Sequence, residues 1–404
     1  MTHEIDRRDQ PTDERAGHVE LSGMTDATLD WLCRDAPRLS TIGEVLEGLS
    51  VRLVAEGVPL VRAWHGTLPV HPLVFARGWS WEPGQGGVEE VISQEGRSVA
   101  LDHTSPLHRI RDADTRVRLR LDSPSVPAYP LLSRLYAAGA TDYIVYGLHG
   151  GRVRASLSFT TNEPGGFTAA QLARLDRVRS YAGVTLQSFH LEDLASTLLG
   201  TYLGSGPGKR VLNGQVHRGD GETLRAATWF CDLRGFTSAS ESLPLPELLL
   251  RLNDWFEAMV GAVEAHGGEV LKFMGDGMLA AFTEPDAAAA CRAALRAAKD
   301  GEARIAEVNK RRDRRERPIL FGLALHYGDV MYGNIGAPAR LDFTVIGPVV
   351  NRAARLQALT AGVGRTVVVS ETFAKLCDEP MISLGMHMMK GLPEPLEVFT
   401  PAWG

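Results

Sequence analysis

FCDLRGFT (residues 230–237) and EVLKFMGDGMLAAF (residues 269–282) each place one aspartate beside glycine at the end of an apolar run. The segment between Asp232 and Asp276 is long enough for a helix that returns the chain to the first strand. A lone aspartate in a Gly-Asp-Gly turn is ordinary turn chemistry. Two carboxylates about 4 Å apart, however, repel by roughly 1 kcal/mol in water and several-fold more at an effective dielectric near 20. A cation between them removes this cost, so the pair predicts a site for divalent cations, Mg²⁺ or Mn²⁺.

Strands and helices alternate around these two segments. ATWFCDL, EVLKFM and MLAAF have the composition of buried strands, and the Gly-Asp-Gly turn joins the last two as a hairpin. The other expected elements are an amphipathic helix over residues 244–268, a helix capped by Asp286, strands within residues 319–336 and 342–347, and a helix from Asn351. This order predicts an α/β (α+β) sandwich of the ferredoxin-like kind for residues 224–404.

The first half of the chain has a different pattern. Residues 1–26 are charged and poor in large apolar residues, which predicts a disordered tail. Residues 27–195 read as helix, strands, an irregular middle, a hairpin and a long exit helix. The middle, about residues 84–130, is rich in Pro, Ser and Asp, which indicates loops or a lid. A Gly-rich polar segment then predicts a helical or transducer linker over residues 196–223.

Two local patterns in this half are specific. YIVYGL from Tyr143, the turn HGGR and the run VRASLSF predict an antiparallel hairpin. Thr168 and Gln171 have capping-box spacing and predict the start of a helix. The apolar stripe of this helix continues to Tyr202, which leaves two interpretations open. One is a single helix of about thirty residues that forms a parallel dimer stalk, and the other is two helices that split near His190.

Composition limits the class of protein. The 404 residues suffice for two domains, and 44% hydrophobic and 23% charged content is that of a soluble globular protein. A formal charge of −6 argues against nucleic acid as a partner. Four scattered cysteines without CxxC spacing indicate neither zinc nor a disulfide framework. No apolar stretch approaches the roughly 18 residues of a membrane span, and no apolar signal core is present. The sequence therefore predicts a cytoplasmic protein without a membrane partner.

FCDLRGFT, EVLKFMGDGMLAAF and NRAAR (residues 351–355) resemble the corresponding segments of class III nucleotidyl cyclases. The resemblance implies conversion of ATP to 3′,5′-cyclic AMP and pyrophosphate by a two-metal mechanism at a homodimer interface. One ion helps to deprotonate the ribose 3′-hydroxyl, and the other neutralises the leaving pyrophosphate. The metal and substrate contacts that the resemblance implies are Asp232, Leu233 (through its backbone carbonyl), Asp276, Phe236 and Thr237.

Lys272 occupies the position that reads the purine in this family. An ammonium can donate to N1 of adenine, whereas guanine presents an N1–H donor and favours a carboxylate, so Lys272 predicts ATP. A site whose polar group is left unpaired by the wrong substrate discriminates strongly. The second base-reading position corresponds to Thr344, which resembles the threonine-bearing subgroup of adenylate cyclases. A hydroxyl both donates and accepts, so we expect specificity to rest mainly on Lys272.

Asn351 and Arg355 are at positions i and i+4, which places both on one face of the expected helix. The resemblance implies that Asn351 orients the ribose and that Arg355 offsets charge developing on the α-phosphate. Lys390 corresponds to the phosphate-binding lysine of the family. Pro348 departs from the polar residue that relatives commonly carry, and it stiffens the turn before the helix.

The order of elements in residues 27–195, together with GRVRASLSFTTNEPGGFTAAQLARL (residues 151–175), resembles a GAF-type sensor domain. The resemblance implies that an unknown small-molecule or protein signal regulates the cyclase. Two alternatives remain open. A guanylate cyclase is disfavoured by Lys272, and a catalytically silent dimeric regulatory module would be expected to lack ligands that this chain retains.

Overall fold

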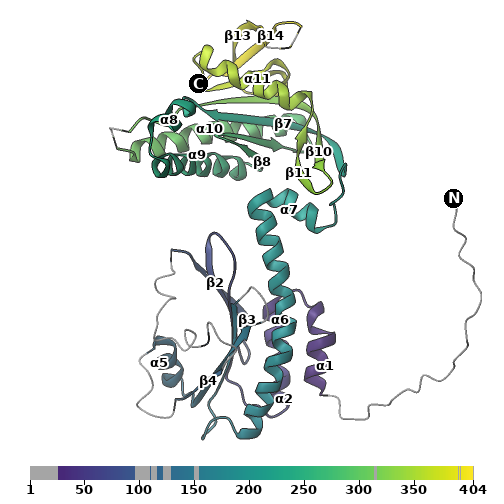
Figure 1. Cartoon of the computed structure of the whole chain (residues 1–404), viewed down its shortest axis with the longest axis vertical. Coiled ribbons are helices and arrows are strands. Elements are labelled where there is room, and N and C mark those ends of the chain that lie inside the picture. The colour runs from purple at the N-terminus through teal and green to yellow at the C-terminus, as the bar shows by residue number, and fades with distance from the viewer. Residues whose placement is uncertain are drawn as a thin grey trace, which may run out of the picture. The chain divides into compact units, whose positions relative to one another are not determined.

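The computed structural model describes residues 26–95, 110, 116–121, 129–149, 154–313, 316–389, 391 and 393–403. Contacts between residues divide the chain into two units, Met1–Leu194 and Ala195–Gly404. Each unit has its own sheet and its own hydrophobic core (Figure 1). The predicted tail lies outside the described residues apart from Asp26. This residue caps the first helix, because its side chain accepts a hydrogen bond of 3.2 Å from the backbone N–H of Leu29.

The N-terminal unit is a six-stranded antiparallel sheet in the order β3-β2-β1-β6-β5-β4. One face packs against α1, α2 and α6, and the other packs against α5. The elements are α1 (Ala27–Arg34), a 3-10 turn (Ala36–Arg38), α2 (Ile42–Ala55), β1 (Arg62–Leu68), β2 (Val74–Glu82), β3 (Gly86–Ser93), β4 (Arg116–Arg120), α5 (Pro130–Ala137), β5 (Asp142–His149), β6 (Arg154–Thr161) and α6 (Ala169–Leu203).

The hairpin of β5 and β6 is confirmed, whereas the prediction of loops over residues 84–130 missed two strands, β3 and β4. These strands form the two edges of the sheet, and they carry the charged runs that protect edges from further pairing. β3 (GGVEEVIS) lacks the apolar alternation by which a strand is recognised, whereas β4 (RVRLR) alternates but is only five residues long. Of the two interpretations left open for the helix after Thr168, the split near His190 is wrong, because α6 runs unbroken for 35 residues. His190 is buried in it, with Nε2 3.0 Å from Nε2 of His65 on β1.

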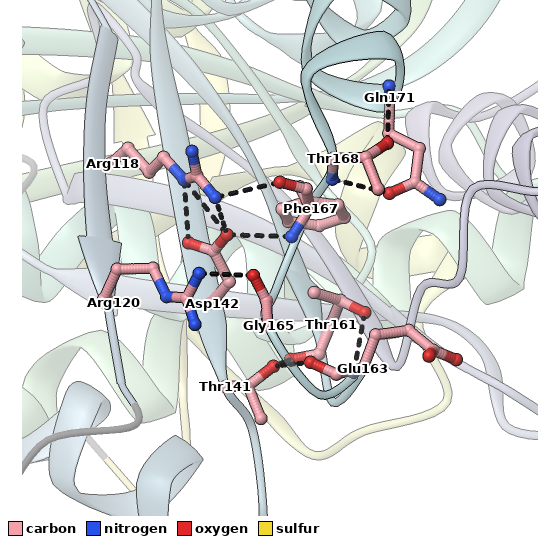
Figure 2. Close-up of polar contacts among 10 residues, drawn as sticks. All are labelled: Arg118, Arg120, Thr141, Asp142, Thr161, Glu163, Gly165, Phe167, Thr168 and Gln171. Atoms are coloured by element: carbon pink, nitrogen blue, oxygen red, sulfur yellow. Dashed lines mark hydrogen bonds and ion pairs between the residues drawn. The ribbon is translucent and has the colours of Figure 1, made fainter.

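A polar network fastens the start of α6 to the sheet (Figure 2). The buried carboxylate of Asp142 accepts hydrogen bonds from Nη2 and Nε of Arg118, at 2.6 and 3.0 Å, and from the backbone N–H of Phe167 at 2.9 Å. The predicted capping box follows directly. Thr168 Oγ1 accepts from the backbone N–H of Gln171 at 3.3 Å, and the Gln171 side chain accepts from the backbone N–H of Thr168 at 2.9 Å. The helix therefore begins where the sequence predicted.

We expect Asp142→Asn to lower the free energy of opening of β5 and β6 by about 2–4 kcal/mol, because it leaves a half-buried guanidinium without its carboxylate. Glu82→Gln is the matched control. Its carboxylate lies 3.8 Å from Arg62 and is 46% exposed, so a change of less than about 1 kcal/mol is expected. Native-state hydrogen exchange of the β5 and β6 amides measures both values. Equal losses in the two variants would contradict the assignment.

The C-terminal unit is built on an eight-stranded sheet in the order β13-β14-β12-β10-β7-β9-β8, with β11 paired to β10. Helices α9, α10 and α12 cover one face, while α11, the start of the unit and β11 cover parts of the other (Figure 1). The elements are α7 (Ser205–Leu212), β7 (Gly221–Leu233), α8 (Phe236–Ser242), α9 (Leu245–Ala265), β8 (Glu269–Met274), β9 (Gly277–Phe282), α10 (Ala287–Arg311), β10 (Phe321–Ala337), β11 (Arg340–Ile346), α11 (Pro348–Gly362), β12 (Val367–Ser370), α12 (Glu371–Leu376), β13 (Met381–His387) and β14 (Leu396–Pro401).

These elements confirm the predicted α/β sandwich, including the central hairpin. Asp286 caps α10 as predicted, since its side chain accepts from the backbone N–H of Ala289 at 3.0 Å. The Gly-rich segment predicted as a connector contains one further helix, α7. Among the helices of the described residues, none combines the length and the apolar character that crossing a membrane requires.

The connector after α7 joins the sheet at β10. The backbone N–H of Asn334 donates to the carbonyl of Asp220 at 2.8 Å, and its side-chain amide donates to the carbonyl of Gln215 at 2.7 Å. The neighbouring Gly333 must be glycine, because a Cβ there would lie 2.3 Å from the Asp220 carbonyl oxygen. On its other edge Gly333 pairs with Thr344 of β11. The connector therefore contacts the strand that carries a predicted base-reading residue.

Candidate functional site

The two aspartates meet where β7 ends beside the β8–β9 turn. The pairing of Cys231 with Met278 brings Asp232 level with Gly277, the residue after Asp276. A Cβ on Gly277 would lie 3.2 Å from the Cys231 carbonyl and 3.4 Å from Asp232 Oδ1. Glycine thus lets the turn approach β7 closely enough for the two carboxylates to interact.

Buried groups hold both aspartates in place. The indole Nε1–H of Trp255, on α9, donates to the backbone carbonyl of Asp276 at 3.0 Å. Trp255 is itself fully buried in the core between α9 and the sheet. On β7, the backbone N–H of Leu233 donates to Asp232 Oδ1 at 3.1 Å. The turn and the strand end are therefore fixed from opposite sides of the site.

The electrostatics of this pair are those of a cation site. Partial burial, and then the adjacent Asp276 carboxyl, raise the pKa of Asp232 to about 7. Burial disfavours the charged form and a second carboxylate disfavours it further, so the pair holds a proton near neutral pH. A divalent cation supplies the positive charge that the proton supplies otherwise, and carboxylate oxygens are the ligands that Mg²⁺ and Mn²⁺ prefer. The residues fit such an ion.

Three other predicted contacts follow on the same strand end. The side chain of Leu233 is buried in the core, so only its backbone is available as a ligand. Phe236 and Thr237 open α8, with Phe236 packed against the core and Thr237 exposed. Gly235 between them and the strand has φ +73°, a left-handed conformation that favours glycine.

Lys272 and Thr344 belong to a second group of residues. The Lys272 ammonium forms an ion pair with Asp342 of β11, two residues before Thr344. The arm formed by β10 and β11 therefore bends back until β11 contacts β8. Asp342 was not among the predicted site residues. The period of two in a strand could have indicated it, because that period places Asp342 and Thr344 on the same face of β11.

Asn351 and Arg355 lie on α11 as predicted, with Asn351 exposed. A Cβ built on Gly391 would meet Arg355 Nη2 at 3.3 Å, so this guanidinium lies beside the C-terminal loop. Lys390, the residue before Gly391, lies outside the described residues. Pro348 occupies the first turn of α11, where no backbone donor is needed, so this departure is compatible with the helix.

One chain thus assembles two separate groups. The carboxylates lie at the end of β7 and in the β8–β9 turn, and the residues predicted to read the base lie on β8 and β11. Lys272 lies within β8 and pairs with Asp342, whereas Asp276 lies in the turn after β8, next to Asp232. Asp342 and the supporting Trp255 were not among the site residues that the sequence predicted.

Residues 222–396 match the family model described as the adenylate and guanylate cyclase catalytic domain. The C-terminal unit is therefore similar to a cyclase catalytic domain. The cyclase domain is similar to an adenylate cyclase of Anabaena cylindrica, at 32% identity over 161 residues, which are 40% of this chain and 32% of that protein. It is also similar to adenylate cyclase 1 of Rhizobium meliloti, at 30% identity over 42% of this chain and 26% of that protein. The matched part spans about a third of the length of these relatives or less.

Solved structures resemble the cyclase domain as well. A bacterial light-regulated adenylyl cyclase is 29% identical, with a TM-score of 0.41, over 45% of this chain and 91% of that one. The guanylyl cyclase Cya2 is 30% identical, also with a TM-score of 0.41, over 45% of this chain and 93% of that one.

The raised pKa of Asp232 makes the metal-free cyclase domain sensitive to pH. A carboxyl whose folded pKa lies above its unfolded value binds a proton more tightly when folded, so stability falls as pH rises from about 4 to about 7. Asp232→Asn lacks this titrating carboxyl, so it should not show this fall in stability with rising pH. In EDTA, calorimetry should show Asp232→Asn raising the melting temperature at pH 8 by about 2–4 °C and leaving it unchanged at pH 4. Asp378→Asn, which alters a highly exposed ion pair, should show no such pH dependence. An equal shift at both pH values would contradict the raised pKa.

Proposed function

We propose that this protein is an adenylate cyclase that converts ATP to 3′,5′-cyclic AMP and pyrophosphate. The ribose 3′ oxygen forms a bond to the α-phosphorus, the bond from that phosphorus to the bridging oxygen breaks, and the 3′-hydroxyl proton is released. The paired carboxylates of Asp232 and Asp276 carry this proposal, because their arrangement suits cations that would bind a triphosphate. The adenylate cyclases among the similar curated proteins support it.

Asp232, Asp276 and the backbone carbonyl of Leu233 would hold two Mg²⁺ or Mn²⁺ ions. When bound, these ions lower the pKa of the 3′-hydroxyl and neutralise the pyrophosphate. The chain supplies the position of the carboxylates through Trp255 and the close approach at Gly277. The half-buried site limits water around the reacting groups, which strengthens their electrostatic interactions.

The other predicted residues would act on the base, the ribose and the phosphates. The Lys272 ammonium donates to N1 of adenine, and Thr344 lies on the neighbouring strand. Asn351 orients the ribose, and Arg355 offsets the charge that develops on the α-phosphate. The roles of Phe236, Thr237 and Lys390 remain those expected from the sequence, as substrate contacts.

We place the complete active site at the interface of a homodimer. The separation of the two groups within one chain supports this arrangement. One subunit would contribute Asp232 and Asp276, and its partner would contribute a second group of side chains, Lys272, Thr344, Asn351 and Arg355. A twofold axis makes the interface self-complementary, so the dimer has two equivalent sites.

The N-terminal unit is proposed as a sensor of the GAF type. Its core includes the first part of α6, and the same helix continues into the C-terminal unit. A ligand that changes the packing around this helix would therefore bias the cyclase domain through a continuous element.

Guanylate cyclase activity is the second candidate. The observation that favours it is the Asp342 carboxylate beside Lys272, because guanine bound in a pose different from that of adenine could donate its N1–H to Asp342 and accept at O6 from Lys272. ATP and GTP must therefore be compared directly.

Product analysis with purified protein tests the activity. We expect cyclic AMP from ATP with Mg²⁺ or Mn²⁺, and much less cyclic GMP from GTP. Asp232→Asn and Asp276→Asn should each lower kcat/KM by at least about 100-fold, because each removes several kcal/mol of charge stabilisation. Asp378→Asn, an exposed carboxylate-to-amide change on the same unit, should stay within about twofold. No cyclic nucleotide under any of these conditions, or preference for GTP, would contradict the proposal.

Subunit exchange tests the shared site. Asp232→Ala and Lys272→Ala proteins should each be inactive alone. Mixed in equal amounts, they should recover about a quarter of the wild-type activity, because half of the dimers are mixed and each mixed dimer has one intact site. Asp232→Ala mixed with Asp276→Ala is the control, and it should recover nothing because both changes fall in the same half-site. Absence of recovery in the first mixture, with exchange verified by mass-tagged subunits, would refute the shared site.

A further inference from the structure

The ion pair between Lys272 and Asp342 joins two strands whose residues are 70 positions apart. The ladder between β8 and β9 shifts register between Val270 and Lys272, which marks a bulge next to the lysine. The side chains of Lys272 and Asp342 are 38% and 50% exposed. Thr344, on the same face of β11, is only 8% exposed. Of these two possible acceptors, Asp342 is the one that is open to a ligand and already next to the ammonium.

Adenine presents two adjacent groups on its Watson–Crick edge, the N1 acceptor and the exocyclic 6-amino donor. We propose that Asp342 is a specificity-determining residue of this site. Its carboxylate accepts a hydrogen bond from the 6-amino group of adenine while Lys272 donates to N1. This inference rests on the proposed cyclase function and deepens it, because it adds an acceptor that sequence reasoning assigned only to the hydroxyl of Thr344.

The contact between the two side chains leaves room for a base. An ammonium has three donors and a carboxylate has about four acceptor sites, so each group can keep its partner and still bind the purine. An exposed ion pair also contributes little by itself, so a small movement of either side chain toward the ligand is easily made. Asp342 therefore acts with Lys272 and does not block it.

The order of the two groups along the base edge decides between purines. Guanine presents O6 as an acceptor where adenine has its amino donor, and N1–H as a donor where adenine has its N1 acceptor. With Lys272 and Asp342 fixed on different strands, guanine in the same pose would face the carboxylate with O6 and the ammonium with N1–H. Both contacts would be repulsive. A hydroxyl in place of the carboxylate would tolerate either base, since it can donate or accept.

Purine riboside triphosphate tests this contact, because it retains N1 and lacks the 6-amino group. We expect the wild-type protein to prefer ATP over this analogue by about 10- to 100-fold in kcat/KM. Asp342→Ala should lower kcat/KM for ATP by about the same factor and leave that for the analogue within about threefold. Asp342→Asn, which keeps one acceptor oxygen and the shape of the side chain, should retain an intermediate preference.

Asp329→Ala is the matched control. It removes another exposed strand aspartate, which pairs with Arg225, and its ratio of ATP to analogue should be that of the wild type. Melting temperatures of all variants verify folding. If Asp342→Ala lowers the activity with both nucleotides equally, Asp342 only positions Lys272 and the inference is overturned. If it changes neither, the base does not contact Asp342.

A binding measurement separates this inference from the proposed function. Calorimetry with Ca²⁺ in place of the catalytic ion gives the dissociation constants of ATP and of the analogue without requiring turnover. A wild-type protein that forms no cyclic nucleotide but binds ATP more tightly than the analogue, with the preference lost in Asp342→Ala, would refute the activity and support the base contact. A wild-type protein that binds both nucleotides equally would refute the base contact whatever its activity.

Discussion

The repulsion between the carboxylates of Asp232 and Asp276 is the constraint on which the C-terminal unit depends. Two such carboxylates reduce their repulsion either by moving apart or by retaining a proton. The raised pKa of Asp232 corresponds to retention of a proton. The fold prevents the carboxylates from moving apart. The β7–β9 register, the missing side chain at Gly277 and the Trp255 hydrogen bond hold the turn against the strand end. The fold therefore holds together two carboxylates whose mutual repulsion a bound divalent cation would relieve.

The proposed recognition of the base requires a different arrangement from that of the carboxylate pair. It needs a donor and an acceptor in a fixed order, and two strands supply one each: β8 carries Lys272, and β11 carries Asp342 and Thr344. The order is fixed only because the arm of β10 and β11 bends back to β8. A hydroxyl alone could not impose this order, whereas an ammonium and a carboxylate held by separate strands can.

Much of this architecture could be predicted because it is local. The capping box at Thr168, the N-cap at Asp286 and the hairpin around Asp276 each lie within a few residues, and each is confirmed. The edge strands β3 and β4 were missed because β3 does not alternate and β4 is a short run within a segment rich in Pro, Ser and Asp. The contacts of Asp342 with Lys272, and of Trp255 with the Asp276 carbonyl, depend on how distant strands and helices pack. Such long-range contacts cannot be predicted from the spacing of residues along the chain.

The bonds of Asn334 to the connector have a mechanical consequence. Asn334 ties residues 215–220 to β10 beside Gly333, which is paired with Thr344. Gly333 packs so closely against Asp220 that a Cβ would not fit, so the connector is in direct contact with the strand that pairs with β11. The carboxylates are anchored separately, through α9 and the central strands. In the proposed cyclase, a displacement of residues 215–220 would therefore reach the strand pair that carries Thr344 before it reaches the carboxylates, so nucleotide affinity would respond before metal affinity.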